Sequence, residues 1–356
     1  MQVISLESLG WRQRWAEAYA PYEERYNVGR IALEHKHMYR VFTEQGDLLA
    51  EVSGKLRHEA SGREDYPAVG DWVLLQARPE EGKATIHGVL PRSSKFSRKV
   101  AGALTEEQIV AANVDTVFLV NALNYDFNLR RIERYLILAW ESGANPVIVL
   151  SKADLCEDPE ELAREVESVA IGVPVHIVSA FTEQGIEELR PYVGDGSTVA
   201  LLGSSGAGKS TLINLLMGEP VQETQAVREG DDRGRHTTTY RELFLLPGGG
   251  LMIDTPGMRE LQLWHAEEGL GGTFAEIEEL AAGCRFSDCR HEKEPGCAVR
   301  GGLSDGTLDA GRYESYKKTQ RELAYLAAKD DIRARQQQKE RNKKLSSFVK
   351  QHAKKR

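Results

Sequence analysis

The chain has 356 residues, 41% of them hydrophobic, and a net charge of −8, a composition that can build the cores of two or three domains. No stretch approaches the ~20 apolar residues of a membrane-spanning helix, and Glu7 and Arg12 lie close to the first apolar residues, which argues against a signal peptide. We therefore expect a cytoplasmic, monomeric protein with no membrane partner.

The positive charge is concentrated at the C-terminus. Residues 332–356 hold ten Lys and Arg and one Glu, a net +9 that leaves −17 on the rest of the chain. A basic tail on an acidic body favours a polyanionic partner, and a solvated, frayed helix end is the alternative interpretation.

The first 105 residues predict a helical extension followed by a small barrel. Within residues 1–27, Trp11, Trp15 and Tyr19 have the spacing of one helix face. Residues 28–105 then contain five short β-type runs separated by polar or Gly-containing turns, which favour an OB-fold, with an SH3-like barrel as the alternative. The five runs are residues 29–33, 38–42, 48–52, 71–75 and 85–89.

Residues 106–265 have the alternating pattern of an α/β domain. Apolar residues recur at helical spacing between Ile132 and Trp140. Strands and helices in alternation predict a parallel sheet with covering helices. The expected strands are residues 116–120, 146–150, 175–178, 199–202 and 251–253.

A Gly-rich segment between one of these strands and a helix matches the pattern G-x-x-x-x-G-K-[ST]. Such a loop turns backbone N–H groups towards phosphate oxygens. Lys209 would reach the β and γ phosphates, and the Ser210 hydroxyl would ligate Mg²⁺. The segment, with the first residue of the helix that follows, is Gly203-Ser204-Ser205-Gly206-Ala207-Gly208-Lys209-Ser210-Thr211.

A second motif, Asp254-Thr255-Pro256-Gly257, lies 44 residues after Ser210. Asp254 can hold the Mg²⁺ shell through water, and the Gly257 amide can contact the γ-phosphate, as in a nucleotide-dependent switch segment. The polar stretch of residues 233–239 is the natural source of a threonine hydroxyl for the metal. The candidates are Thr237 and Thr238, with Thr239 beside them.

Guanine recognition is predicted at Ser151-Lys152-Ala153-Asp154, which follows a strand. Asp154 would accept from the ring imide and the exocyclic amine, and Lys152 would stack on the base. A serine replaces the usual asparagine of an N-K-x-D box and can make fewer contacts. Ser179 and Ala180 would give the supporting contact, so we favour GTP over ATP.

The two nucleotide motifs occur in permuted order. The guanine box precedes the phosphate loop, and the 26 residues between Gly257 and Cys284 are too few for the base-reading strands that would normally follow. The strands upstream must therefore read the base, and the segment after Asp254 leads directly into the C-terminal module.

In many GTPases a glutamine shortly after this switch motif orients the water that attacks the γ-phosphate, and this chain lacks it there. Met258 follows Gly257, and an apolar side chain cannot polarise water. The nearest replacement is His236 in the segment before the threonines.

Residues 266–356 contain a cluster of metal-ligating residues and then the basic helical tail. Three thiols and an imidazole lie within 14 residues, a set suited to a closed, structural Zn²⁺ site, whereas Cys156 stands alone. The four ligands are Cys284, Cys289, His291 and Cys297.

The barrel, the permuted GTPase motifs and the Cys/His cluster, in this order, resemble the ribosome small-subunit-dependent GTPase A family over roughly residues 28–325. The resemblance implies an OB-fold that binds ribosomal RNA, GTP hydrolysis stimulated by the small ribosomal subunit, and a role in the late maturation of that subunit. The leading interpretation is an RNA-dependent GTPase that docks on a ribosomal particle and leaves it on hydrolysis. It also implies a catalytic role for His236 and zinc in the C-terminal domain. A small-molecule kinase or ATPase, and a nucleic-acid-binding module with a vestigial nucleotide site, are the alternative interpretations.

Overall fold

The computed structural model describes residues 5–35, 38–99, 107–194, 196–218, 220, 241–254 and 267–328. The chain forms two compact units, residues 1–262 and residues 263–356. His236, Thr237, Thr238, Gly257 and the basic tail lie outside the described residues. Within the described part, no helix combines the length and the apolar character that crossing a bilayer requires.

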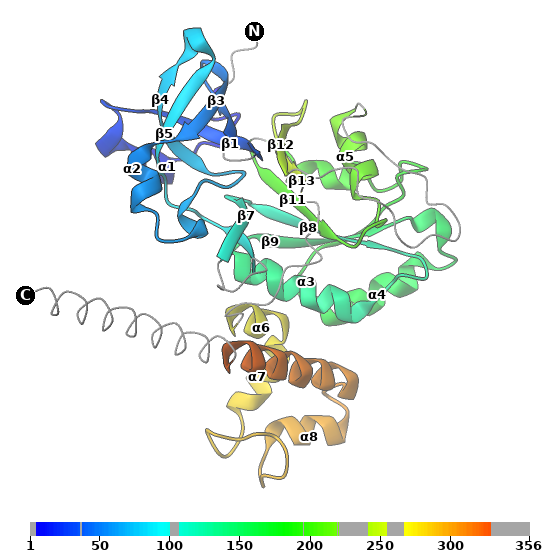
Figure 1. Cartoon of the computed structure of the whole chain (residues 1–356). Coiled ribbons are helices and arrows are strands. Elements are labelled where there is room, and N and C mark those ends of the chain that lie inside the picture. Colours follow the sequence, from blue (N-terminus) through cyan, green and yellow to red (C-terminus); the bar gives the residue numbers. More distant parts are fainter. Residues whose placement is uncertain are drawn as a thin grey trace, which may run out of the picture. The chain divides into compact units, whose positions relative to one another are not determined.

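The N-terminal strands close into a barrel with the order β1-β2-β3-β5-β4, in which β4 also pairs with β1 (Figure 1). Alternate side chains of these strands, among them Ile31, Val41, Leu48, Val73 and Ile86, are fully buried in one core, because successive strand residues face opposite sides. The predicted OB-like barrel is confirmed. Its strands are β1 (Asn27–His35), β2 (Met38–Thr43), β3 (Gly46–Val52), β4 (Trp72–Arg78) and β5 (Lys83–Val89), with α2 (Gly54–Glu59) after β3.

The predicted N-terminal helix is shorter than expected. Helix α1 covers Gln13–Tyr19, a 3₁₀ turn covers Ala20–Tyr22, and turns precede them. Trp11 lies before the helix, and its ring centroid is 4.6 Å from that of the buried Trp72 on the barrel. The aromatic residues therefore serve to pack the extension on the barrel, and a long helix is not needed for that contact.

A buried arginine ties the extension, the barrel and the nucleotide domain together. Arg30 of β1 is 1% exposed, and its guanidinium donates to the backbone carbonyls of Leu9, Gly70 and Asn113. Burial lowers the pKa of Arg30 to about 10, and the three carbonyl groups supply the hydrogen bonds that a buried cation requires.

A hairpin that the sequence did not indicate connects the barrel to the nucleotide domain. Strand β6 (Lys95–Lys99) pairs antiparallel with β7 (Glu107–Ala112). Lys95 Nζ forms an ion pair with Glu107 Oε1 at 2.9 Å.

The nucleotide domain is built on a sheet with the strand order β10-β9-β8-β11-β13-β12. The strands are parallel except for β12, which is antiparallel to β13. Strand β11, which leads into the phosphate loop, lies between β8, which precedes it in sequence, and β13, which follows it. The strands are β8 (Thr116–Ala122), β9 (Asn145–Ser151), β10 (Val175–Ile177), β11 (Thr198–Gly203), β12 (Glu242–Leu245) and β13 (Leu251–Asp254).

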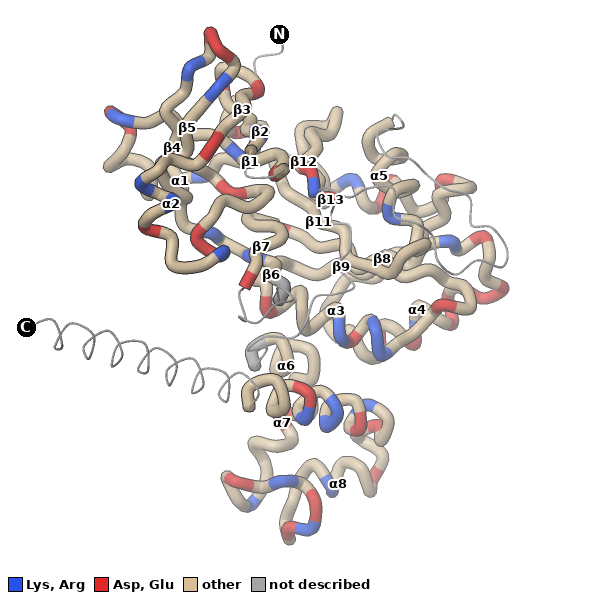
Figure 2. Tube along the Cα trace, in the orientation of Figure 1, with Lys and Arg blue, Asp and Glu red and all other residues tan. Residues whose placement is uncertain are grey.

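Helices cover both faces of this sheet. Helices α3 (Leu129–Ser142) and α4 (Pro159–Val169) lie on one face and α5 (Lys209–Met217) on the other (Figure 1). Helix α3 begins at Asn128, whose side chain accepts from the Arg131 amide, and ends at the left-handed Gly143, the expected cap residues at each end. Lys and Arg are interspersed with Asp and Glu along α3 and α4 (Figure 2), as expected for helices with one solvated side.

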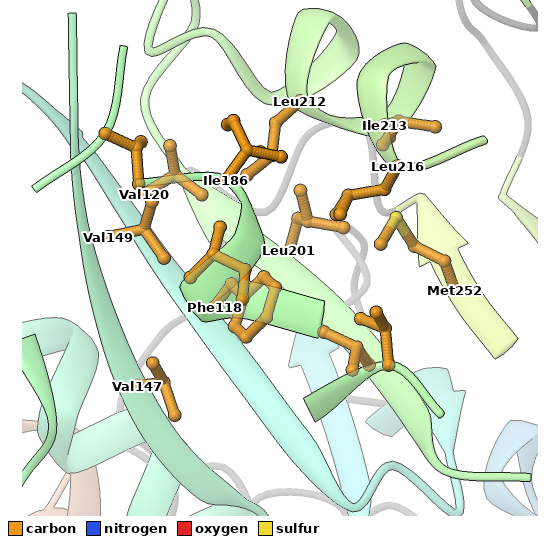
Figure 3. Close-up of a cluster of buried hydrophobic side chains, with 14 of the residues drawn as sticks. Phe118, Val120, Val147, Val149, Ile186, Leu201, Leu212, Ile213, Leu216 and Met252 are labelled. Carbon is orange, nitrogen blue, oxygen red and sulfur yellow. The ribbon is translucent and has the colours of Figure 1, made fainter. Parts of the chain in front are cut away.

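The core beneath α5 fixes the phosphate loop at the edge of the sheet. Leu212, Ile213 and Leu216 of α5 pack with Phe118, Val120, Leu201 and Met252 of the strands (Figure 3). The helix is thus held on the sheet at its apolar face, and its N-terminus lies at the carboxyl end of β11.

The second unit is helical around a small aromatic core. It contains α6 (Glu267–Thr273), α7 (Ala275–Ala282), α8 (Ala298–Asp305) and a further helical stretch over residues 310–328. Phe274 packs against Tyr316 with ring centroids 5.5 Å apart, and Arg312 lies over the Phe274 ring and pairs with Glu276 at 2.7 Å. The mostly helical C-terminal module predicted from the sequence is confirmed.

Candidate nucleotide and metal sites

The loop between β11 and α5 is shaped by glycines. Gly206 and Gly208 have φ of 76° and 88°, values that side chains oppose. At Gly203 a Cβ atom would lie 2.3 Å from the carbonyl oxygen of Val120, so β11 and β8 approach each other too closely for any side chain. The loop backbone therefore reaches the N-terminus of α5, where N–H groups and the helix dipole favour phosphate.

Lys209 folds back across this loop. Its Nζ donates to the carbonyl oxygens of Gly203 at 2.8 Å and Ser204 at 2.7 Å. Ser210 and Thr211 follow in the first turn of α5, half-buried and exposed respectively, and Ser205 lies half-buried in the loop. The site thus offers an ammonium group and hydroxyl groups beside a set of backbone donors.

The end of β9 brings a carboxylate to the same edge of the sheet. Lys152 has a left-handed φ of 59°, which turns the chain so that the Ala153 amide donates to the carbonyl of Val178 at 3.2 Å. Ser179 Oγ donates to Asp154 Oδ1 at 2.5 Å, and no second hydrogen bond to the Asp154 carboxylate is found in the described part of the chain.

This carboxylate can read a guanine edge. One oxygen is held by Ser179, next to the half-buried Ala180, and a carboxylate has lone pairs for two further N–H donors. A carboxylate accepts from guanine N1–H and N2–H, and it rejects adenine, which offers an unprotonated N1 there.

Ser151, the last residue of β9, connects this strand to the loop between β11 and α5. Its Oγ, buried at 7% residue exposure, donates to the carbonyl oxygen of Ala207 at 2.7 Å. The two segments are 56 residues apart in sequence. The serine therefore makes a structural bridge, and its one proton is already used there, so it has no donor left for the base.

Two residues beside the phosphate loop were missed by the sequence reasoning. Asp126, in the loop after β8, accepts from Ser204 Oγ at 2.9 Å. Arg131 of α3 pairs with the same carboxylate at 3.0 Å. Neither belongs to a recognisable motif, so only the fold could reveal them.

Asp254 lies at the carboxyl end of β13 with 5% exposure. Strand β13 is the parallel neighbour of β11. Asp254 therefore lies at the same end of the sheet as the start of the phosphate loop. Its backbone partner on β12 is Glu242. A buried carboxylate at this position fits the outer shell of a Mg²⁺ ion bound to a nucleotide, and the Ser210 hydroxyl in the first turn of α5 would be the direct ligand.

The four Cys and His ligands of the second unit lie together and could hold a metal ion, with their ligand atoms within 4.8 Å of one another. Cys284 Sγ is 3.8 Å from Cys297 Sγ, and His291 Nδ1 is 3.5 Å and 3.4 Å from the sulfurs of Cys284 and Cys297. A tetrahedral Zn²⁺ with ordinary bond lengths separates its ligand atoms by about 3.5–3.8 Å. Cys289 completes the set, so the residues fit zinc.

Two features around this cluster orient the ligands. Cys297 is the N-cap of α8, and its sulfur accepts from the Arg300 amide at 3.4 Å. Glu294, which the sequence reasoning missed, accepts from the amides of Arg290, Glu292 and Lys293. Backbone N–H groups, its own and then those of Arg290 and Lys293, lower the pKa of Glu294 to about 2. Its carboxylate thus shapes the loop that carries His291, whose φ is 59°.

Comparison with known proteins agrees with this architecture. A model of the RsgA GTPase family matches residues 89–264. The protein named "Small ribosomal subunit biogenesis GTPase RsgA" from Opitutus terrae is 50% identical over 352 residues, 96% of this chain and 96% of that protein. The protein of the same name from Methanosarcina acetivorans is 43% identical over 345 residues, 97% and 92% of the two chains.

Two solved structures share the fold. The crystal structure of YjeQ from Thermotoga maritima aligns with a TM-score of 0.63 and 30% identity, over 84% of this chain and 98% of that one. The structure of YloQ, described as a circularly permuted GTPase, aligns with a TM-score of 0.62 and 26% identity, over 85% and 96%.

The barrel, the permuted nucleotide sheet and the Cys/His cluster define a circularly permuted P-loop GTPase. With relatives 50% identical over nearly its whole length, the chain belongs to the RsgA GTPase family. The resemblance inferred from the motifs is confirmed, and the protein is a GTPase.

Proposed function

We propose that this GTPase acts in late maturation of the small ribosomal subunit, where it hydrolyses GTP to GDP and phosphate to drive its own release from the particle. The observation that supports this most directly is the direct joining of the barrel to the nucleotide sheet, with β1 paired to β12. The names of the relatives supply the particle: they are small ribosomal subunit biogenesis GTPases. The proposed partners are the small subunit and its ribosomal RNA, which the barrel would bind. We propose that the protein acts as a monomer in the cytoplasm.

The proposed nucleotide site combines the two motifs at the edge of the sheet. Asp154 reads guanine, with Lys152 stacking on the base, and the loop amides with Lys209 hold the phosphates. Mg²⁺ would be held by Ser210, by a hydroxyl of Thr237 or Thr238, and by Asp254 through water. When bound, the ion draws charge from the β and γ phosphates. The remaining contacts come from Ala153, Ser179, Ala180, Gly257 and the loop residues Gly203, Ser204, Ser205, Gly206, Ala207, Gly208 and Thr211. Ser151 supports these contacts through its bond to the Ala207 carbonyl.

The metal proposed for the second unit is one structural Zn²⁺, bound by Cys284, Cys289, His291 and Cys297. Three thiolates and one imidazole are soft ligands that select zinc over Mg²⁺ or Ca²⁺. Because four protein ligands close the tetrahedron, no position is left for substrate, which supports a structural role.

Hydrolysis requires a water molecule aligned with the γ-phosphorus. The water oxygen forms the new P–O bond as the bond to the GDP oxygen breaks, and the water proton passes to a phosphate oxygen or to a base. We assign the orienting role to His236, because Met258 occupies the position where many GTPases have glutamine.

Replacing His236 with alanine is expected to slow turnover by about 10²-fold or more, the range of a positioned general base, with GTP affinity changed little. Single-turnover hydrolysis and the binding of a fluorescent, non-hydrolysable GTP analogue separate the two effects. His352→Ala, in the basic tail, is the matched control. Unchanged turnover of His236→Ala would remove His236 from the mechanism.

Ser151→Asn is expected to tighten GTP binding by about two- to ten-fold, the value of one added hydrogen bond. Asparagine has two N–H groups, so it can keep the bond to the Ala207 carbonyl and add one to the base. Ser151→Ala should loosen binding, since the Ala207 carbonyl then loses its donor. Equal or weaker affinity of Ser151→Asn, measured by titration calorimetry, would show that the site compensates for serine by other contacts.

The function is tested by GTP hydrolysis with and without purified small ribosomal subunits. Strong stimulation by small subunits alone is expected, with ATP and large subunits as controls. Hydrolysis that is indifferent to ribosomes, or specific for ATP, would leave the fold intact and overturn the proposed function.

A further inference from the structure

One row of residues crosses from the nucleotide site to the barrel. In the strand register, Asp254 of β13 pairs with Glu242 of β12, Glu242 pairs with Leu33 of β1, and Leu33 pairs with Arg40 of β2. Residues in register lie on the same face of a sheet. The end of β13 and the surface of the barrel are therefore separated by only two residues.

Glu242 contacts both neighbouring strands and a side chain of the barrel. Its backbone pairs with Asp254 and with Leu33, and its Oε1 accepts from Arg40 NH1 at 2.9 Å. Strand β1 meets β12 at a single register pair among the described residues, so the ion pair supplies a second connection across a narrow joint. Burial raises the pKa of Glu242, and Arg40 opposes that shift.

Arg40 is prepared for this contact by the barrel itself. Its Nε and NH2 donate to Asp47 Oδ2 at 2.9 Å and 2.7 Å, and its guanidinium lies 5.2 Å from the Phe42 ring centroid. Because the guanidinium group is planar and rigid, its NH1 group remains available to Glu242. With its side chain 43% exposed, Arg40 is also accessible to an anionic ligand on the barrel.

The sequence adds a reason to expect that β12 responds to the bound nucleotide. Glu242 follows Thr239 by three residues, and its partner Asp254 begins the motif Asp254-Thr255-Pro256-Gly257. Both segments proposed to contact Mg²⁺ and the γ-phosphate therefore adjoin the β12–β13 pair. The Arg30 contacts, by comparison, join the barrel to Asn113 ahead of β8, away from these two segments in sequence.

We propose that Glu242 is a positioning residue that couples the barrel to the nucleotide site, by holding Asp254 in register on one side and Arg40 of the barrel on the other. An RNA phosphate that binds the exposed side of Arg40 changes the contact between Arg40 and Glu242, and Glu242 passes this change to the support of Asp254. This coupling rests on the proposed function, because it uses Asp254 as a support of the metal and RNA as the anionic ligand of the barrel.

The test compares hydrogen exchange of the barrel in two nucleotide states. In the full-length protein, exchange of residues 38–43 is measured with GDP and with a non-hydrolysable GTP analogue, in the presence of Mg²⁺. We expect the two states to differ, and Arg40→Gln or Glu242→Gln to abolish the difference. The charge-swapped double variant Arg40→Glu with Glu242→Arg should restore at least part of it.

A second readout follows the nucleotide site directly. Glu242→Gln and Arg40→Gln should raise the Mg²⁺ concentration for half-maximal GTP hydrolysis by about two- to five-fold, the range that a partly exposed ion pair supports. The matched control is Arg78→Gln, which removes another exposed ion pair of the barrel, with Glu81, and leaves Arg40, Asp47 and Glu242 in place.

The outcomes separate the coupling from the function. If wild-type protein binds and hydrolyses GTP but residues 38–43 exchange equally in both states, the coupling is overturned and the function stands. If Arg78→Gln has the same effects as Glu242→Gln, a general loss of barrel stability explains both, and the coupling is overturned. If wild-type protein does not hydrolyse GTP, the proposed function fails and the coupling fails with it.

Discussion

Replacing Asp154 with asparagine is expected to lower GTP affinity by about 10³- to 10⁴-fold, and to shift the preference towards xanthosine triphosphate. An asparagine amide would direct an N–H group at the N–H groups of guanine, and the guanine donors would be buried without acceptors. Sites built around such hydrogen bonds discriminate between ligands with and without the matching group by about 10⁴–10⁵-fold. We expect a smaller loss of affinity here, because the phosphate contacts are retained. Xanthine has a carbonyl in place of the exocyclic amine and can accept from the new amide.

The measurement is direct titration of wild-type and variant protein with fluorescent analogues of GTP, ATP and xanthosine triphosphate. Asp158→Asn, the same chemical change at the N-cap of α4, is the control and should leave all three affinities unchanged. Asp154→Asn protein that still binds GTP with wild-type affinity would mean that another group reads the base.

The nucleotide motifs were predictable because each is contiguous and lies between elements with a clear hydrophobic period. The phosphate loop lies between an apolar run, Val199–Leu202, and the helix that begins at Lys209. The permuted order followed from sequence position alone. These features need no knowledge of which strands are neighbours in the sheet.

Other parts of the fold were not predictable, because they depend on contacts between distant segments. Strand β12 has four residues and begins with Glu242, too short and too polar at its start for a period to show. The burial of Arg30 depends on carbonyl groups up to 83 residues away, and a strand pattern contains no information about them. The N-terminal extension was overpredicted as helix because aromatic spacing also suits packing against Trp72.

In the candidate site, the motif residues could be predicted from the sequence, but the residues that contact them could not. Ser151 was noted as a departure from asparagine, but its bond to the Ala207 carbonyl could be seen only in the folded chain. Asp126 and Glu294 are single acidic residues, a type that is usually solvated on the surface. Their roles come from the amide and hydroxyl donors that the fold brings to them.

Replacing Cys297, one of the four proposed zinc ligands, with serine is expected to abolish stable folding of residues 267–328 and to leave nucleotide binding in place. Structural zinc sites contribute about 10–16 kcal/mol in small domains, more than the small core around Phe274 and Tyr316 can replace. The nucleotide site belongs to the other compact unit, so GDP affinity should change little.

Limited proteolysis read by mass spectrometry, together with zinc content by atomic emission, checks both expectations. Cys297→Ser protein should lose its zinc and be cleaved rapidly between residues 267 and 328, and a strong chelator should produce the same cleavage in wild-type protein. Cys156→Ser, which alters the cysteine outside the cluster, should retain zinc and resist cleavage. If freshly purified wild-type protein contains no zinc, or if Cys297→Ser resists the protease as wild type does, then the cluster does not hold this unit together through a metal, and hydrogen bonds such as those to Glu294 must carry its stability.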